Sequence, residues 1–406
     1  MASSSAAPAE HGLLRQGRTL SMMLTFACTA ECTHCSTLSS PRNRDHLPAA
    51  DALRAIDEAA GLGFVNVVFT GGEATLRWDD LLTCIGRASG HGLRTRLVTN
   101  AHWALTPEVA ETTLDRLLDA GLDEINFSTG DEHARFVPLP RVAQAAAATA
   151  RRGLTAHVMV ELRHVREVTA ARLLAEPAIQ ELEPEARALV RPSESPWMPV
   201  KPFKVERYPD GVASRREDLP KLAGCDSVLQ TYTVQPNGRV AACCGLAMRL
   251  VPELNVGEVA GEHTLRTAID EAEDDLLKLW LRAAGPEAIL AWASDRDPEI
   301  AWEGMYGHRC QACLRLYKDP KVRAAIVDGY EEEIPAVVQA AWLKDRYVPS
   351  RLSELFGPAD EPTRPASSTP SEADIGTKAE KARECASGTP GCAPAPSHDS
   401  PPPARS

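Results

Sequence analysis

Short apolar runs alternate with amphipathic stretches along the first half of the chain, over residues 18–192. The apolar runs, which predict β-strands, are residues 19–27, 65–70, 93–100, 123–128, 155–162 and 186–192. Stretches of helical period lie between them, at residues 48–63, 78–92, 106–121, 138–153 and 166–176. Repeated strand–helix units of this length require a parallel sheet. The pattern therefore predicts an α/β fold, and six such units suggest a complete or partial barrel.

Residues at the ends of these elements agree with this assignment. Several predicted helices end at glycine, and Thr106 before Pro107 is a typical N-cap followed by proline at the first helical position. In barrels of parallel strands, the chemistry lies at the C-terminal ends of the strands. Cys28, Gly71, Asn100 and Ser128 lie at the C-terminal ends of the first four predicted strands. We therefore expect a functional site where these loops meet.

The composition changes after the predicted barrel. Residues 193–224 are rich in proline and charge and predict a linker or substrate-side loop, and residues 225–356 form a smaller cysteine-bearing region that ends in helix. Within it, Asn237-Gly238 predicts a tight hairpin turn. No aromatic residue follows Phe356, and ten of the 31 prolines gather there, so we expect residues 357–406 to be a disordered tail. Residues 1–17 are expected to be a flexible N-terminus.

The charge and the cysteine content restrict the class of protein. Acidic residues number 56 against 44 basic ones, giving a net charge of −12, which disfavours nucleic acid as a partner. The N-terminal stretch is rich in alanine and serine and has neither a secretory pattern nor a run that could span a bilayer, so we expect a cytoplasmic protein without a membrane partner. In that compartment the 11 cysteines are better explained as metal ligands or catalytic thiols than as disulfides.

Cys28, Cys32 and Cys35 follow the first predicted strand. Three thiolates on a cubane iron–sulfur cluster leave the fourth iron without a protein ligand, free to bind a cofactor or substrate. Two other interpretations remain open. The spacing would also place the three side chains on one face of a helix, and a zinc site could recruit Cys84 or His34 as a fourth ligand.

These residues resemble the signature of the radical S-adenosylmethionine (radical SAM) superfamily, C-x3-C-x2-C after the first strand. The stretch "TGGEATL" after the second strand is similar to that family's Gly-Gly-Glu element, here Gly71, Gly72 and Glu73. The resemblance implies a partial (β/α)6 TIM-type barrel, a [4Fe–4S] cluster on the three cysteines, and S-adenosylmethionine on the open iron. It also implies that Gly71, Gly72 and Glu73 bind the amino group of the methionine moiety.

The resemblance extends to further cofactor contacts, with one departure. Family members usually carry an aromatic residue before the third cysteine, near the adenine, where this chain has His34. Asn100 and Ser128 resemble the family's contacts to the carboxylate and ribose. By resemblance to peptide-modifying members, Asp131 and His133 are expected to face the substrate or the adenosyl group. Asp131 is also compatible with a simple turn-capping role.

A second set of cysteines lies in the C-terminal region. Cys225, Cys243, Cys310 and Cys313 resemble the "Twitch" form of the SPASM extension, which implies one auxiliary [4Fe–4S] cluster. A structural zinc site is the alternative, because four thiolates also satisfy zinc. Cys244 is expected to be a hydrogen-atom donor to a substrate radical, the true ligand in place of Cys243, or a small buried side chain. Cys84 is expected in the core, and Cys385 and Cys392 are expected to be inert.

The resemblance implies reductive cleavage of S-adenosylmethionine to a 5′-deoxyadenosyl radical that removes a hydrogen atom from the substrate. An external electron donor such as flavodoxin or ferredoxin would supply the electron. Our leading hypothesis is modification of a ribosomally made peptide, by epimerisation if Cys244 donates hydrogen and by cross-linking if it does not. One alternative is oxidation of a small molecule such as a sugar alcohol. Another is a non-catalytic binding protein stabilised by zinc or a cluster.

Overall fold

The computed structural model describes residues 17–201, 203–259 and 264–356. Its centre is a sheet of nine strands in the order β6-β5-β4-β3-β2-β1-β7-β8-β9. The strands are β1 Thr19–Met23, β2 Asn66–Thr70, β3 Arg94–Thr99, β4 Glu124–Thr129, β5 Ala156–Leu162, β6 Val190–Pro196, β7 Thr231–Val234, β8 Arg239–Ala241 and β9 Asn255–Glu258. Strands β1 to β6 pair in parallel, as the sequence pattern predicted.

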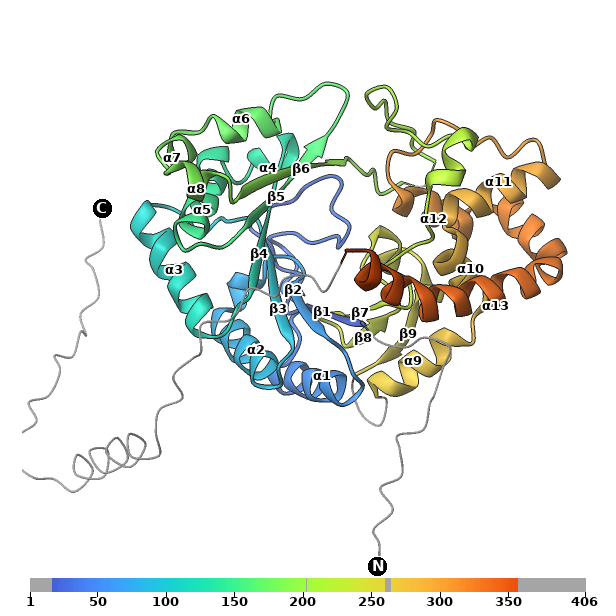
Figure 1. Ribbon diagram of the computed structural model, residues 1–406, viewed down its shortest axis with the longest axis horizontal. Coiled ribbons are helices and arrows are strands. Elements are labelled where there is room, and N and C mark those ends of the chain that lie inside the picture. The colour runs from blue at the N-terminus through green and yellow to red at the C-terminus, as the bar shows by residue number, and fades with distance from the viewer. Residues whose placement is uncertain (1–16, 202, 260–263, 357–406) are drawn as a thin grey trace, which may run out of the picture. The chain divides into compact units, whose positions relative to one another are not determined.

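Helices cover the outer side of the six parallel strands, which form an open arc (Figure 1). The helices are α1 Ala49–Gly61, α2 Trp78–Gly90, α3 Pro107–Asp119, α4 Asp131–Ala134, α5 Leu139–Arg151, α6 Ala170–Leu174, α7 Pro177–Gln180 and α8 Pro184–Arg187. The predicted α/β partial barrel is therefore confirmed. The predicted N-cap is confirmed too, because the Thr106 hydroxyl accepts a hydrogen bond from the Val109 N–H at 3.3 Å.

Apolar side chains on alternate strand positions hold the arc together. Leu20 and Met22 on β1, Phe69 on β2, Leu97 on β3 and Phe127 on β4 are all fully buried. Burial of a side chain of this size stabilises the fold by about 1.5–3 kcal/mol. The packed strands give the loops at their C-terminal ends a rigid base.

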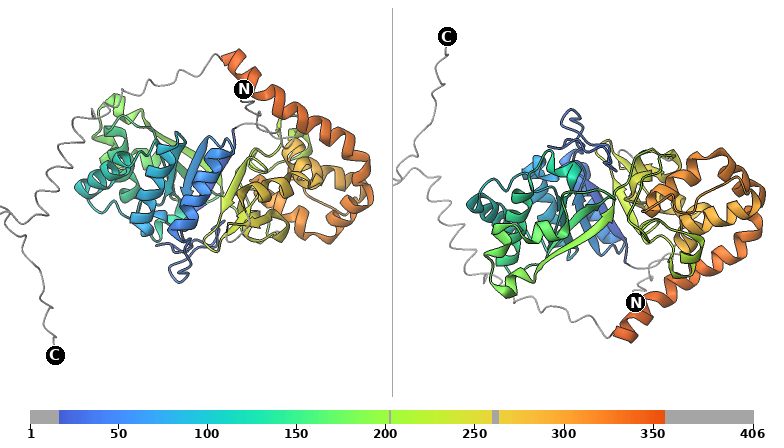
Figure 2. Two further views of the ribbon diagram at one scale, coloured as in Figure 1. Left: turned by 90° about the horizontal axis from the view of Figure 1, so that it is seen from below. Right: turned by 90° about the horizontal axis from the view of Figure 1, so that it is seen from above.

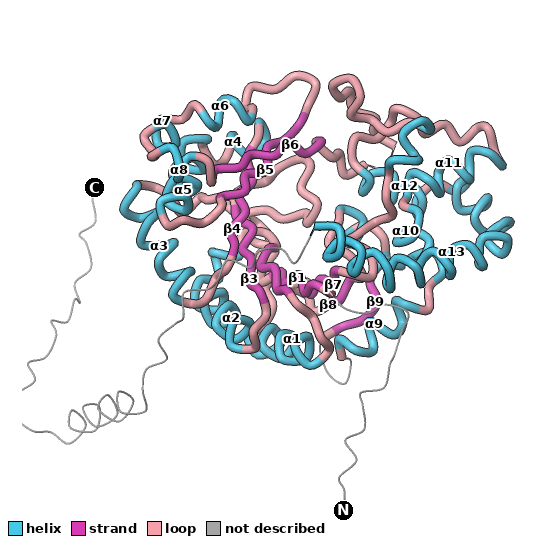
Figure 3. The backbone as a smooth tube through the Cα atoms, viewed as in Figure 1, coloured by secondary structure: helices cyan, strands magenta, loops and turns pink. Residues whose placement is uncertain are grey.

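The C-terminal region continues the same sheet rather than forming a separate one. Strand β7 pairs in parallel with β1, from Thr19 opposite Thr231, and β8 and β9 follow in antiparallel order. The predicted hairpin turn is present, with Gly238 at φ +81°. Helices α9 Leu265–Glu273, α10 Leu276–Ala284, α11 Pro286–Arg296, α12 Arg309–Lys318 and α13 Pro320–Phe356 complete the region (Figures 2 and 3). The sequence pattern did not predict that this region adds strands to the barrel's sheet.

The boundaries differ from our expectation at one point. Strand β6 runs to Pro196, so residues 193–196 belong to the sheet and not to the expected linker. Residues 1–16 of the expected flexible N-terminus 1–17 lie outside the described residues, and so does the expected disordered tail with Cys385 and Cys392. No described helix combines the length and apolar character needed to cross a membrane.

Candidate functional site

The loops that follow β1 to β4 meet around a cavity of about 230 Å³. Almost every site residue predicted from the barrel sequence lines it: Cys28, Cys32, His34, Cys35, Gly71, Gly72, Asn100 and Ser128. Glu73 does not. The structure therefore gathers the cysteine loop, the glycine pair and the ends of β3 and β4 at one place, at the C-terminal edge of the parallel strands.

The loop that carries the three cysteines is not a helix. Isolated bridges join Thr25 to His46 and Ala27 to Ser40, and the cysteines lie in irregular loop between Ala27 and Ser40. The Cys35 N–H donates to the Cys32 carbonyl at 3.1 Å. The interpretation of these residues as one face of a core helix is therefore wrong. Cys84 is fully buried inside α2, as expected for a core residue. It therefore does not serve as the fourth ligand that the zinc interpretation required.

Hydrogen-bond donors surround the cysteine sulfurs. Cys28 Sγ accepts from the Ala30 N–H at 3.4 Å and lies 3.6 Å from Asn100 Nδ2, and Cys35 Sγ accepts from the Ser39 N–H at 3.4 Å. Burial raises the pKa of Cys28 to about 12, and burial together with the neighbouring Cys35 raises the pKa of Cys32 further. A thiolate ligand needs positive charge beside it to exist at neutral pH. Three thiols at one cavity, with donors already aimed at two of the sulfurs, fit a bound iron–sulfur cluster.

Gly71 and Gly72 are required by close backbone packing. The Gly72 N–H donates to the Thr25 carbonyl at 2.8 Å, and the Glu73 N–H donates to the Ala27 carbonyl at 2.8 Å. A Cβ on Gly72 would lie 2.1 Å from the Ala27 oxygen, and Gly71 has φ +124°. The glycine pair therefore packs against the chain that leads into Cys28 and leaves its backbone open to the cavity.

The carboxylate of Glu73 is used inside the protein. Glu73 is 1% exposed, and it accepts hydrogen bonds from the Thr75 and Thr99 hydroxyls at 2.7 and 2.8 Å and from the Asn100 N–H at 2.9 Å. Asn100 in turn donates from Nδ2 to Thr29 Oγ1 at 3.0 Å. In this structure Glu73 holds Asn100 in place, and its predicted contact with the cofactor stays a prediction. The sequence analysis did not identify Thr75 or Thr99.

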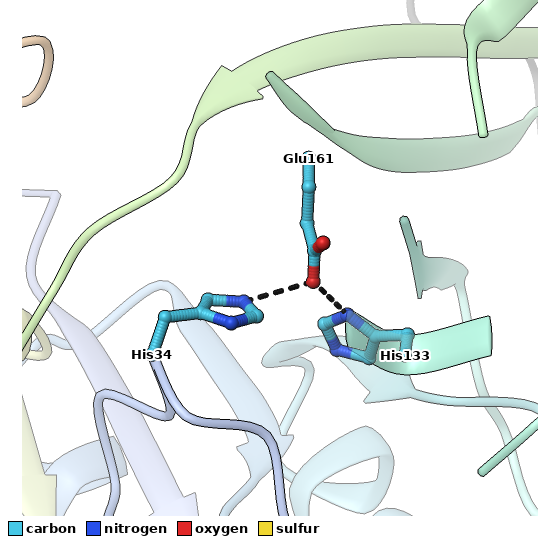
Figure 4. Close-up of side chains that lie close together, drawn as sticks. All are labelled: His34, His133 and Glu161. Carbon is cyan, nitrogen blue, oxygen red and sulfur yellow. Dashed lines mark hydrogen bonds and ion pairs between the residues drawn. The ribbon is translucent and has the colours of Figure 1, made fainter. Parts of the chain in front are cut away.

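A second group of polar side chains lies at the same cavity (Figure 4). His133 Nδ1 and Glu161 Oε1 are hydrogen-bonded at 2.7 Å, and His34 Nε2 forms an ion-pair contact with the same oxygen at 3.1 Å. Burial lowers the pKa of His34 to about 4. Burial works to raise the pKa of Glu161, but the hydrogen bond from His133 and the charges of both histidines outweigh it and keep this pKa below its usual range.

The sequence analysis singled out His34 and His133 but not Glu161. The sequence feature that could have identified Glu161 is a carboxylate near the end of an otherwise apolar predicted strand. Asp131 takes the turn-capping role, because its carboxylate accepts from the backbone N–H groups of Glu167 and Val168 at 3.1 and 2.8 Å. Its expected orientation toward the substrate finds no support in these contacts.

The four cysteines of the C-terminal region line a second, small and largely apolar cavity: Cys225, Cys243, Cys310 and Cys313. The last two lie in the first two turns of α12, and Cys243 follows β8. Burial raises the pKa of Cys310 to about 12 and raises those of Cys243 and Cys313 as well, with the neighbouring thiols adding to each shift. The arrangement fits a metal group that would hold all four as thiolates.

Cys244 lies close enough to Cys225 and Cys310 to interact with them electrostatically, but it does not line the four-cysteine cavity. Its Sγ is 3.3 Å from the Ser227 hydroxyl, and it lines neither of the two cysteine-bearing cavities. The structure therefore turns Cys243, and not Cys244, toward the other three cysteines. The predicted role of Cys244 as hydrogen-atom donor finds no support in this placement.

Curated relatives match a short part of the chain. The PqqA peptide cyclase of Methylorubrum populi is 35% identical over 122 residues, which is 30% of this chain and 28% of the relative. The PqqA peptide cyclase of Granulibacter bethesdensis is 35% identical over 109 residues, 27% of this chain and 28% of the relative. The chain therefore spans less than a third of the length of these relatives.

Solved structures match a larger part at lower identity. Native anSMEcpe with bound AdoMet and Cp18Cys peptide is 11% identical, with TM-score 0.49, over 80% of this chain and 98% of that one. Streptococcus suis SuiB bound to precursor peptide SuiA is 17% identical, with TM-score 0.47, over 66% of this chain and 67% of that one.

The family model of the Radical SAM superfamily matches residues 22–131. The match contains the three-cysteine loop, the glycine pair, Glu73 and Asn100. This superfamily uses S-adenosylmethionine and a [4Fe–4S] cluster, which agrees with the donor set at the first cavity. Residues 22–131 of this chain are therefore similar to the radical SAM superfamily.

Proposed function

We propose that the chain is an enzyme that reductively cleaves S-adenosylmethionine and modifies a peptide. The observation that carries the proposal is the first cavity, where Cys28, Cys32 and Cys35 meet without a fourth cysteine among its lining residues. In the proposal these three thiolates hold a [4Fe–4S] cluster whose open iron binds the cofactor. When bound, cluster and cofactor supply a carbon radical that removes a hydrogen atom from the substrate.

The residues of the chain position the cofactor and protect the chemistry. The backbone at Gly71 and Gly72 is open to the cavity and would bind the amino group of the cofactor. Asn100 also lines the cavity and would bind the carboxylate of the cofactor. Val98, Met159 and Met198 line the same cavity and limit the water around a reactive species. The cavity opens at the C-terminal ends of the strands, where substrates of such barrels bind.

In the proposal the second cavity holds an auxiliary [4Fe–4S] cluster on Cys225, Cys243, Cys310 and Cys313. This assignment rests on the four-thiol donor set, which zinc would satisfy equally well, so the two are separated by iron content. A peptide substrate is favoured by the names of the curated relatives, which are PqqA peptide cyclases. Because Cys244 lies outside the first cavity, we favour cross-linking over epimerisation.

The test starts from protein purified and reconstituted without oxygen. We expect about eight iron atoms per chain and formation of 5′-deoxyadenosine on addition of reductant and S-adenosylmethionine. Cys32→Ala should abolish deoxyadenosine formation, whereas the matched Cys244→Ala should retain it. Candidate peptides from neighbouring short reading frames are then incubated with the reduced enzyme, and mass spectrometry should show the loss of two hydrogen atoms. A colourless zinc protein without deoxyadenosine formation would refute the proposal.

A further inference from the structure

Three side chains from separate elements converge beside the first cavity, which two of them line (Figure 4). His34 comes from the cysteine loop, His133 from α4 and Glu161 from β5. Their nearest nitrogen and oxygen atoms all lie within 4.8 Å of one another. This group includes none of the seven cysteines assigned to clusters above.

The group carries a buried negative charge without a full positive partner. The side chains of His34, His133 and Glu161 are 12%, 19% and 6% exposed. Among the described ion pairs, Glu161 has only the two imidazoles as partners. Arg163 approaches Glu132 instead, at 3.6 Å. A buried carboxylate is stable when it is paired with a cation or bound to a metal.

The spacing of the donor atoms fits a single ion. Two ligand atoms about 2.1 Å from a tetrahedral ion lie roughly 3.4 Å apart. The nitrogens of His34 and His133 lie 3.1 and 2.7 Å from Glu161 Oε1, so a small rotation of the carboxylate would make room for an ion between the three. His34 Nδ1 is buried and has no hydrogen-bond partner among the described residues.

The surroundings also hold the ligands in position. The Glu132 N–H donates to Glu161 Oε2 at 3.0 Å, which leaves Oε1 as the oxygen that faces the histidines. Trp197 packs 5.8 Å from the His34 ring between centroids. Such outer contacts orient metal ligands in proteins. Because His34 and His133 also line the cavity, the remaining coordination positions of an ion here would face the space open to a substrate.

We propose that His34, His133 and Glu161 bind a divalent transition-metal ion, zinc or ferrous iron, with open coordination positions toward the cavity. Two imidazoles and one carboxylate are a ligand set that both ions accept, zinc in catalytic sites and ferrous iron in oxygen-dependent enzymes. The ion would bind an oxygen or nitrogen atom of the substrate and hold it beside the three-cysteine site. The inference does not depend on the radical chemistry proposed above.

The experiment uses the full chain with its clusters reconstituted from natural iron, dialysed without oxygen against zinc chloride and then against metal-free buffer. We expect about one zinc ion per chain, with X-ray absorption showing nitrogen and oxygen neighbours at about 2.0–2.1 Å and no sulfur shell at about 2.3 Å. A parallel dialysis against ferrous ions enriched in ⁵⁷Fe, read by Mössbauer spectroscopy, shows whether high-spin ferrous iron takes the same place.

Glu161→Gln and His133→Gln should each reduce metal retention at least tenfold while the cluster iron content stays unchanged. His164→Gln, at an exposed position three residues from Glu161, is the matched control and should bind metal like the unaltered chain. If Glu161→Gln fails to assemble clusters, metal retention in His133→Gln decides between the outcomes. Cluster-loaded protein that retains neither ion, or retention that is unchanged in both variants, would overturn the proposal. Failure to assemble clusters in the unaltered chain would instead count against the proposed function.

Discussion

The carboxylate of Glu73 accepts a hydrogen bond from the backbone N–H of Asn100 across 2.9 Å, which ties the loop after β2 to the end of β3. The hydroxyls of Thr75 and Thr99 donate to its other oxygen. Asn100, held in this way, directs its amide toward the Cys28 sulfur at 3.6 Å. Glu73 therefore acts on the three-cysteine site through Asn100, from a position that water does not reach.

This relationship predicts the effect of Glu73→Gln. An amide cannot accept all of these hydrogen bonds, and its own N–H groups would face other donors, so the free energy of unfolding should fall by about 1–3 kcal/mol. Binding of S-adenosylmethionine to the cluster-loaded protein should weaken as well. Urea unfolding and calorimetric titration measure the two effects. Glu31→Gln is the control, because the Glu31 side chain is 43% exposed, and it should change stability by less than about 1 kcal/mol. Unchanged cofactor binding in a folded Glu73→Gln would contradict the role assigned to this residue.

Gly72→Ala should disrupt the cysteine loop. The added Cβ would lie 2.1 Å from the Ala27 carbonyl oxygen, so the chain leading into Cys28 would have to move. We expect a loss of about 1–3 kcal/mol in stability and poor retention of iron on the three cysteines. Gly61→Ala, where a Cβ meets nothing within 4 Å, is the matched control. If both variants load iron equally, the packing argument for Gly72 is wrong.

The neighbours Cys243 and Cys244 should behave differently. Cys243 lines the four-cysteine cavity, whereas Cys244 contacts Ser227. We expect Cys243→Ala to lose about four of about eight iron atoms per chain and Cys244→Ala to retain them all. Iron analysis after anaerobic reconstitution decides the matter. The opposite result would make Cys244 the ligand, as one of the sequence-based alternatives allowed.

Arg249 should affect the reduction potential of the three-cysteine cluster. Its guanidinium lies 3.8 Å from the centroid of the Phe26 ring. Burial and the nearby Arg239 lower the pKa of Arg249, while Asp45 and Cys35 act in the opposite direction, so its charge is felt at Cys35. Positive charge favours the reduced cluster, so Arg249→Gln should make the reduction potential more negative by tens of millivolts. For a one-electron couple, about 59 mV corresponds to a tenfold change in the equilibrium constant of reduction. Redox titration followed by EPR should show the shift, and Arg249→Lys should largely prevent it.

His102 should contribute to the pH dependence of stability. Burial lowers its pKa in the folded protein below the value of 6.5 that it has when exposed. The unfolded chain therefore takes up the proton first, and the contribution of His102, present above pH 6.5, is lost as the pH falls below that value. Between pH 7 and 5 the slope should reach up to about 1.4 kcal/mol per pH unit. Unfolding of the apo protein should show a shallower decline in His102→Gln, and an identical decline would contradict this assignment.

Features that depend on neighbouring residues were predictable from the sequence. The apolar runs predicted β1 to β6, because parallel strands that are buried on both faces consist mostly of apolar residues. Thr106 marks the start of a helix and Gly238 marks a hairpin turn through interactions with nearby residues. The position of Cys28, Gly71 and Asn100 at the ends of predicted parallel strands was enough to predict one shared site.

Features that depend on distant residues were not predictable. The pairing of β7 with β1 joins residues about two hundred positions apart, and no local pattern encodes it. The same holds for Glu161, whose partners His34 and His133 come from other loops. The choice between Cys243 and Cys244 depends on which side chain faces α12, which the alternation of a short strand alone could not decide.

The central claim is that three cysteines hold a cluster whose open iron binds S-adenosylmethionine. The most direct measurement uses Cys243→Ala, which should lack the auxiliary cluster and carry about four iron atoms. EPR spectra of the reduced protein are recorded with and without S-adenosylmethionine. We predict that the cofactor changes the spectrum, because its amino and carboxylate groups ligate the open iron. A spectrum that stays the same at saturating cofactor, in protein with its iron intact, would contradict the account.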